Sequence, residues 1–124
     1  MECVVRNATR GVVLAERVAV ASSILARLRG LMGTAPLPAQ HGMLLRPCRQ
    51  VHSFFMRYSL DLVFLDGAGR VVRTVEDFRP SRISPFVVAA AAVLELPAGA
   101  LTDSVAVPGD LLSIEPRHAE PGER

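Results

Sequence analysis

The chain has 124 residues, with 14 basic and 12 acidic side chains and a formal net charge of +2 at pH 7. This length fits a single domain, and a hydrophobic content of 50% excludes a disordered chain. The basic residues are all arginine and are scattered. With five Phe, one Tyr and no Trp to interleave with them, the sequence predicts no nucleic-acid partner.

The cysteines and the apolar runs bear on metals and membranes. Cys3 and Cys48 do not have the spacing of a paired metal site, so we expect reduced thiols, no metal and no cofactor. The N-terminus lacks the pattern of an export signal. The longest apolar run, residues 86–94, is about half the length that a membrane-spanning helix needs. The sequence therefore predicts a cytoplasmic protein without a membrane span.

The first elements in chain order are a hairpin and a helix. Two valine-rich segments flank the turn-prone residues 7–11, a pattern typical of a β-hairpin. A helix is predicted over about residues 22–33, where Ser22 or Ser23 can cap its N-terminus and Gly33 can end it. Its core-facing stripe consists of Ile24, Leu25, Leu28, Leu31 and Met32.

From residue 42 onward the pattern becomes extended. Short strands are predicted at residues 43–45, 51–56, 60–65, 71–75, in the second half of 87–96, and up to 114. The predicted fold is mainly β, a small sandwich or barrel of short antiparallel strands with the one amphipathic helix packed against it. A single β-rich domain covers residues 1–115, and residues 116–124 form a polar C-terminal tail.

Asp61 lies in a strand that is apolar on both of its faces. Leu62 and Phe64 share one face of this strand, and Val63 and Leu65 share the other with Asp61. A buried carboxylate needs a partner, and Arg57 is the nearest cation along the chain. The pair is interpreted either as a salt bridge that fixes a bend or as an Arg/Asp pair that lines a pocket.

Four further side chains are candidate ligand-binding residues beside Arg57 and Asp61. They are Arg29, His52, Met56 and Glu95. Asp61 and Glu95 could also form a pair of carboxylates for acid/base catalysis, provided that their environments separate the two pKa values. The alternation of Glu95 with Leu94 and Leu96 instead favours a solvent-facing position on a strand with one buried face.

Several short motifs in a fixed order carry a family resemblance. They occur at residues 29–32, 42–45, 52–57, 60–66, 69–72, 93–99 and 109–110. In this order they resemble the uncharacterised bacterial and archaeal family called domain of unknown function 192, over about residues 20–115. The resemblance implies a compact β-rich fold with one prominent helix, and it supplies no activity, cofactor or substrate.

Within these motifs the chain departs from the family pattern at two positions. Phe55 stands where many similar sequences have Gly or Trp, and Ser59 stands where many have Pro or another small turn former. In a pocket at this place, Phe55 would narrow the opening.

The sequence leaves three functional classes open, and it leaves the oligomeric state open. The favoured class is a non-catalytic module that binds a small molecule or a peptide near Arg57 and Asp61, since the polar candidates are few and form no known catalytic set. The second class is a hydrolase-type acid/base enzyme that uses Asp61, Glu95 or His52. The third is a protein-interaction module in which an exposed strand edge pairs with a partner.

Overall fold

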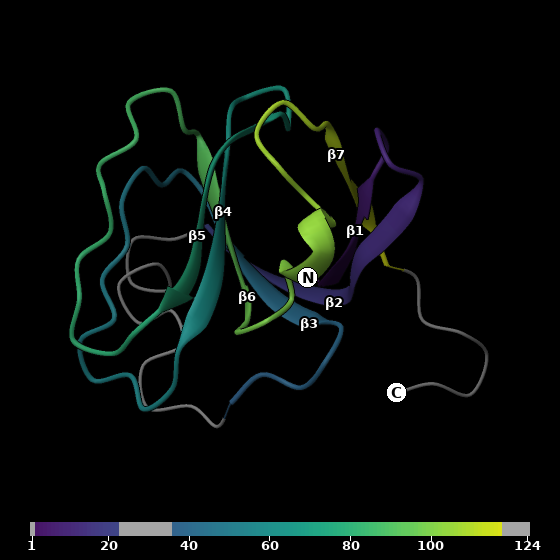
Figure 1. The fold of residues 1–124 in the computed structure, drawn as a ribbon. Coiled ribbons are helices and arrows are strands. Elements are labelled where there is room, and N and C mark those ends of the chain that lie inside the picture. The colour runs from purple at the N-terminus through teal and green to yellow at the C-terminus, as the bar shows by residue number, and fades with distance from the viewer. Residues whose placement is uncertain (1, 23–35, 118–124) are drawn as a thin grey trace.

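Seven strands form one curled sheet in the computed structural model, which describes residues 2–22 and 36–117 (Figure 1). The strands are β1 (Glu2–Asn7), β2 (Val12–Ala21), β3 (His41–Leu45), β4 (Leu60–Leu65), β5 (Val71–Phe78), β6 (Ala92–Pro97) and β7 (Leu112–Pro116). Their order in the sheet is β5-β4-β6-β3-β2-β1-β7. Only β2 and β3 pair in parallel. The mainly β prediction is confirmed. The described strands form one curled sheet and not the two facing sheets of a sandwich.

The two outer strands of the sheet meet at one end. Arg70 and Leu111 form an antiparallel bridge, and the Val71 N–H donates to the Asp110 carbonyl at 2.8 Å. Gly69, at a φ of +90°, lets the backbones approach, because a Cβ there would lie 2.6 Å from the Leu112 carbonyl oxygen. The sheet is therefore a half-barrel whose edges are joined at this end.

The two faces of the sheet carry two separate apolar cores. The segment that contains the short helical turn η1 (Thr102–Ser104) lies inside the curl (Figure 1). Leu101 and Ala106 of this segment pack there with side chains of β1, β2, β4, β6 and β7. On the other face of β4 and β6, Leu62, Phe64 and Val93 pack with Met56 and Phe78. Every residue of β4 is buried, which confirms the prediction of a strand covered on both faces. Burying each apolar side chain of this strand contributes roughly 1.5–3 kcal/mol.

The helix expected over residues 22–33 lies outside the described residues, apart from Ser22. The strand expected over residues 51–56 is wrong, because this segment contributes only one isolated bridge and then turns. The Met56 N–H donates to the Ser53 carbonyl at 3.1 Å, and Phe55 has a φ of +66°, so the chain cannot continue extended there.

The remaining strands agree with the expected pattern. The hairpin of β1 and β2, the strand in the second half of 87–96 and the final strand are confirmed. Across the described residues, no helix is both long and apolar enough to span a membrane.

Candidate functional site

Two irregular segments, residues 49–58 and 79–88, are joined by hydrogen bonds into one surface, which we call the loop pair. The Ser84 N–H donates to the Val51 carbonyl at 2.8 Å, and the Val87 N–H donates to the Arg49 carbonyl at 2.9 Å. His52 and Ile83 form a bridge next to the Ser84–Val51 contact, on the side away from Val87. The loop pair lies on the β5 side of the sheet, away from β1, β2 and β7 (Figure 1).

Ser53 fixes the two loops together. Its side chain is buried, and its Oγ donates to the Arg79 carbonyl at 2.6 Å and accepts from the Arg82 N–H at 2.8 Å. Its backbone N–H donates to the Arg82 carbonyl at 2.9 Å. Ser53 was not among the residues predicted from the sequence. The one local signal for it is a small polar residue directly before two aromatic residues, Phe54 and Phe55. These bonds fix residues 79–82 relative to the segment 49–58, so the two segments have a set arrangement.

Large apolar side chains are exposed on the loop pair. Six such side chains are exposed among residues 2–22 and 36–117, and five of them belong to the loop pair. We call these five the apolar patch: Phe54, Phe55, Ile83, Phe86 and Val88. Phe55 is 80% exposed although its backbone is in the left-handed region, which costs a non-glycine residue roughly 1–2 kcal/mol. An exposed aromatic ring on strained backbone is a feature that folding alone does not require.

A cavity of about 280 Å³ opens beside the apolar patch, between β5 and the loop that follows it. Its lining residues are Val75, Asp77, Phe78, Arg79, Arg82, Ile83, Ser84 and Pro85. The Arg79 Nε donates to an Asp77 carboxylate oxygen at 3.2 Å, whereas the Arg82 guanidinium makes only a 3.4 Å contact, to the Ser81 carbonyl, within the described chain. The cavity therefore combines an apolar wall with a cation that retains donors for an anion.

Asp61 is buried, and backbone N–H groups are its partners. One carboxylate oxygen accepts from the Asp77 N–H at 2.9 Å, and the other accepts from the Gly99 and Leu101 N–H groups at 3.1 and 3.0 Å. These bonds tie β4 to a bulge of β5 and to the turn after β6. The expected Arg57–Asp61 pair is therefore wrong.

Arg57 is exposed on the loop pair. Its guanidinium makes no hydrogen bond or ion pair with another described residue. Met56 is buried in the outer core, and His52 is half-buried, with its ring stacked on that of Phe54 at 5.2 Å between centroids. Arg29 lies outside the described residues.

Glu95 is buried, and the expectation of a solvent-facing position is wrong. The reason is that β6 lies inside the sheet, between β3 and β4, where Glu95 is opposite Met43 and Leu62. Burial raises the pKa of Glu95 to about 7, and Oε1 finds no hydrogen-bond partner within residues 2–22 and 36–117.

Asp61 and Glu95 point to opposite faces of the sheet. Asp61 is paired with Leu96, and Glu95 with Leu62; directly paired residues share a face, and neighbours along a strand alternate. The two carboxylates therefore cannot act on one substrate group. Among the described residues, no three His, Cys, Asp or Glu side chains are grouped to hold a metal ion.

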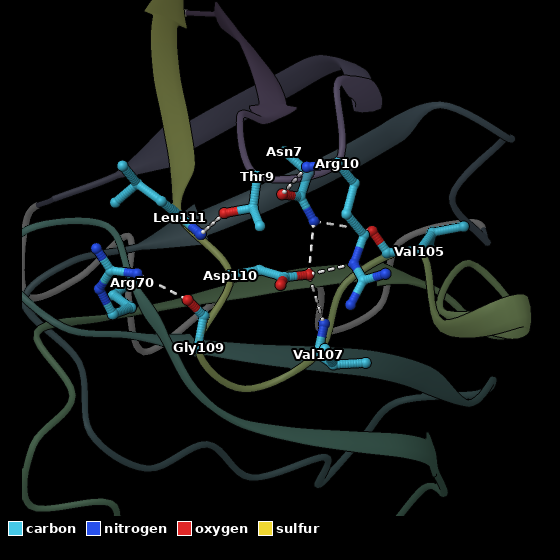
Figure 2. Close-up of polar contacts among 9 residues, drawn as sticks. All are labelled: Asn7, Thr9, Arg10, Arg70, Val105, Val107, Gly109, Asp110 and Leu111. Atoms are coloured by element: carbon cyan, nitrogen blue, oxygen red, sulfur yellow. Dashed lines mark hydrogen bonds and ion pairs between the residues drawn. The ribbon is translucent and has the colours of Figure 1, made fainter.

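A third buried carboxylate, Asp110, lies where β7 joins the rest of the sheet (Figure 2). Its Oδ2 accepts from the Arg10 Nε at 2.6 Å, the Asn7 Nδ2 at 3.0 Å and the Val107 N–H at 3.1 Å. The hydrogen bond from Arg10, followed by that from Asn7, lowers the pKa of Asp110 to about 2. Asn7 is fully buried and also donates to the Val105 carbonyl. This network stabilises the closed end of the half-barrel. From the sequence, only the Gly109-Asp110 motif was noted here, and no role was assigned to Asn7 or Arg10.

The fold defines the chain as a mainly β protein built on a curled seven-stranded sheet. The family model DUF192, described as "Uncharacterized ACR", matches residues 5–114, so the chain belongs to this family. A UPF0127 protein of Thermococcus sibiricus is 33% identical over 113 residues, which cover 88% of this chain and 73% of that protein.

Two solved structures have the same fold. A protein of unknown function from Novosphingobium aromaticivorans is 23% identical, with a TM-score of 0.78, and the match covers 91% of this chain and 84% of that one. A protein from Sinorhizobium meliloti, named for a proposed role as a transcription regulator, is 27% identical, with a TM-score of 0.81 and coverage of 92% and 94%.

Proposed function

We propose that this protein is a non-catalytic binding module whose ligand carries an apolar group and an anionic group and is held on the loop pair. The observation that carries the proposal is the apolar patch beside the arginine-lined cavity. Large apolar side chains that are exposed together on one pair of loops, beside charged residues, are typical of binding surfaces. The scaffold is suited to this role because the two loops are hydrogen-bonded to each other and lie against a rigid sheet.

The charges around the patch favour an anionic ligand. Arg57, Arg79 and Arg82 belong to the loop pair, and Arg57 and Arg82 form no ion pair with another described residue. A guanidinium group offers a planar set of donors that matches a carboxylate or a phosphate in a bidentate geometry. The proposal therefore keeps Arg57 as an anion-binding residue, as the sequence suggested. It no longer includes Asp61 as the partner of Arg57.

Backbone strain supports the same location. Of the six non-glycine residues at positive φ among the described residues, three lie in the loop pair or line the cavity beside it: Phe55, Asp77 and Ser81. Such conformations cost roughly 1–3 kcal/mol each and concentrate at ligand-binding sites.

The hydrolase alternative is disfavoured by the geometry of its carboxylates. Asp61 uses both oxygens for backbone N–H groups, and Glu95 lies on the other face of the sheet. His52 accepts a hydrogen bond from the Phe54 N–H through Nδ1 at 3.3 Å, and no described carboxylate orients its ring. A general base needs such an orienting group and access to a substrate proton.

A fluorescent probe with both required groups, 8-anilinonaphthalene-1-sulfonate, tests the proposal. We expect saturable binding to the wild type, and a dissociation constant about tenfold higher in Phe55→Ser and in Ile83→Ser, which corresponds to about 1.4 kcal/mol per tenfold change. Val12→Ser is the matched control, because Val12 is the exposed large apolar residue of the described chain that lies away from the loop pair, on β2. Arg82→Gln should weaken binding of the sulfonate and leave the fold unchanged.

The same variants show which results would contradict the proposal. Equal affinity in the wild type and both loop variants, or a loss as large in Val12→Ser, contradicts binding at the loop pair. Circular dichroism spectra of all variants must coincide, because partly unfolded protein binds this probe nonspecifically.

A further inference from the structure

Within residues 2–22 and 36–117, the outer edge of β5 leaves backbone groups without a hydrogen-bond partner beside the cavity. β5 is the first strand in the sheet order and pairs with β4 alone along most of its length. The bridge to Leu111 involves Arg70, just before the strand, and the Asp77 N–H is held by Asp61. Between Val72 and Glu76, no described residue outside β4 hydrogen-bonds to the β5 backbone.

The accessible part of this edge is regular and suited to strand pairing. Arg73, Thr74 and Val75 pair with β4 in continuous register, and the register shifts lie on either side of them. Val72, Thr74 and Val75 are β-branched and half-buried, and Arg73 is exposed. An edge of this kind presents N–H and C=O groups on alternate residues to an incoming chain.

The cavity adjoins this edge and is small. Val75, Asp77 and Phe78 line it from β5, and Ile83 links it to the apolar patch. Its volume of about 280 Å³ is below the range of roughly 300–1,000 Å³ that encloses a drug-sized ligand. A space of this size beside a strand edge fits one apolar side chain of an added strand better than a whole small molecule.

We infer that the partner is an extended, acidic polypeptide segment that adds to the sheet as a strand along β5. One apolar side chain of the segment enters the cavity, and the next apolar side chain along the same face contacts the patch around Ile83. The inference rests on the proposed function and names its ligand class.

Charge complementarity favours an acidic segment over a neutral or basic one. Three arginines lie on this strand or line the cavity: Arg73, Arg79 and Arg82. The strand also carries two carboxylates, Glu76 and Asp77, and the Asp77 carboxylate is already paired with Arg79. The surplus positive charge attracts acidic residues that alternate with apolar ones in the partner.

Three defined peptides test the inference by amide chemical-shift mapping of the 15N-labelled full chain. The probe is an acetylated and amidated hexapeptide of alternating Val and Glu. The second peptide replaces Glu with Lys. The third carries an N-methyl group on every residue, so that it has no backbone N–H to donate to a ladder. We expect shifts at residues 72–78 and 82–85 with the Val-Glu peptide, and at least fivefold weaker binding of the other two.

Proline variants of the edge provide the matched test on the protein. Alternate edge residues direct their N–H outward, so one of Arg73→Pro and Thr74→Pro removes an outward donor and preserves the ladder to β4. The variant that stays folded should lose peptide binding at least fivefold and should still bind 8-anilinonaphthalene-1-sulfonate.

The results distinguish this inference from the proposed function. Peptide shifts that are absent at millimolar concentration, or equal for the N-methylated peptide, overturn the strand-addition model, and the proposed function stands if the sulfonate probe still binds. A concentration-dependent dimer in sedimentation that the folded proline variant abolishes identifies a second copy of the chain as the occupant and also overturns the inference. Loss of both ligands in Ile83→Ser, with intact peptide binding in Val12→Ser, supports both.

Discussion

The buried carboxyl of Glu95 makes the stability of this protein depend on pH. Burial raises its pKa from 4.5 to about 7, so the folded state binds a proton more tightly than the unfolded state does. The resulting stabilisation is complete below pH 4.5 and is lost as the pH rises through 7. Between pH 5 and pH 9 this one group should lower the free energy of unfolding by roughly 2–3 kcal/mol.

The perturbation that isolates this effect is Glu95→Gln, which keeps the shape of the side chain and removes its titration. For a domain of this size, a change of about 2–3 kcal/mol corresponds to a shift in Tm of roughly 10 °C. Thermal unfolding followed by circular dichroism at pH 5, 7 and 9 should show that Tm falls by roughly 10 °C more in the wild type than in Glu95→Gln over this range.

A matched control replaces a glutamate of similar chemistry on the surface. Glu115 has a half-exposed side chain and pairs with Arg6, so Glu115→Gln should retain the fall of Tm with pH that the wild type shows. The absolute Tm of Glu95→Gln can be lower at pH 5, because a buried amide needs partners of its own, and the slope with pH is the quantity that decides. Equal slopes in the wild type and Glu95→Gln would refute the assignment of a buried, proton-binding carboxyl at this position.

Three further substitutions test the other assignments. Asp61→Ala should destabilise the protein by roughly 3–5 kcal/mol in urea unfolding, because three backbone N–H groups, one of them in a buried bond, lose a charged acceptor. A loss below about 1 kcal/mol would contradict the described bonds. Asp110→Asn should lower Tm at pH 7 and have little effect on Tm near pH 2. The reason is that the stabilisation by a carboxyl with a lowered pKa is present above pH 3.8 and is lost as the pH falls through about 2. An equal change in Tm at both pH values would argue against the charge of Asp110 as its cause. Phe55→Gly should stabilise the fold by up to about 1 kcal/mol by relieving the left-handed backbone, and should weaken sulfonate-probe binding, whereas a destabilised variant would identify the ring as a packing residue.

The strands with strong local patterns could be predicted from the sequence. β4 is apolar at nearly every position, which indicates burial on both faces, and the structure confirms it. The hairpin of β1 and β2 follows from the turn-prone residues between two valine-rich segments. Residues 51–56 misled the same reasoning, since an apolar and aromatic composition predicts a strand whether the side chains are buried or, as for Phe54 and Phe55, exposed.

The site residues were harder to predict because their surroundings come from distant parts of the chain. The proximity of Arg57 to Asp61 suggested an ion pair, whereas two of the real donors, Gly99 and Leu101, are 38 and 40 residues away. Glu95 alternates with leucines as a surface residue does, and only the interior position of β6 in the sheet buries it. The apolar patch likewise depends on the pairing of His52 with Ile83, which no local pattern specifies.

Amide chemical-shift mapping of the 15N-labelled protein with 8-anilinonaphthalene-1-sulfonate tests the central claim, ligand binding on the loop pair, most directly. The account predicts saturable shifts that concentrate at residues 49–58 and 79–88 and at the cavity-lining end of β5. The N–H groups of Asn7, Val107 and Asp110, at the closed end of the half-barrel, should stay unchanged. Shifts that centre on that end, or that spread over the sheet without saturation, would contradict it.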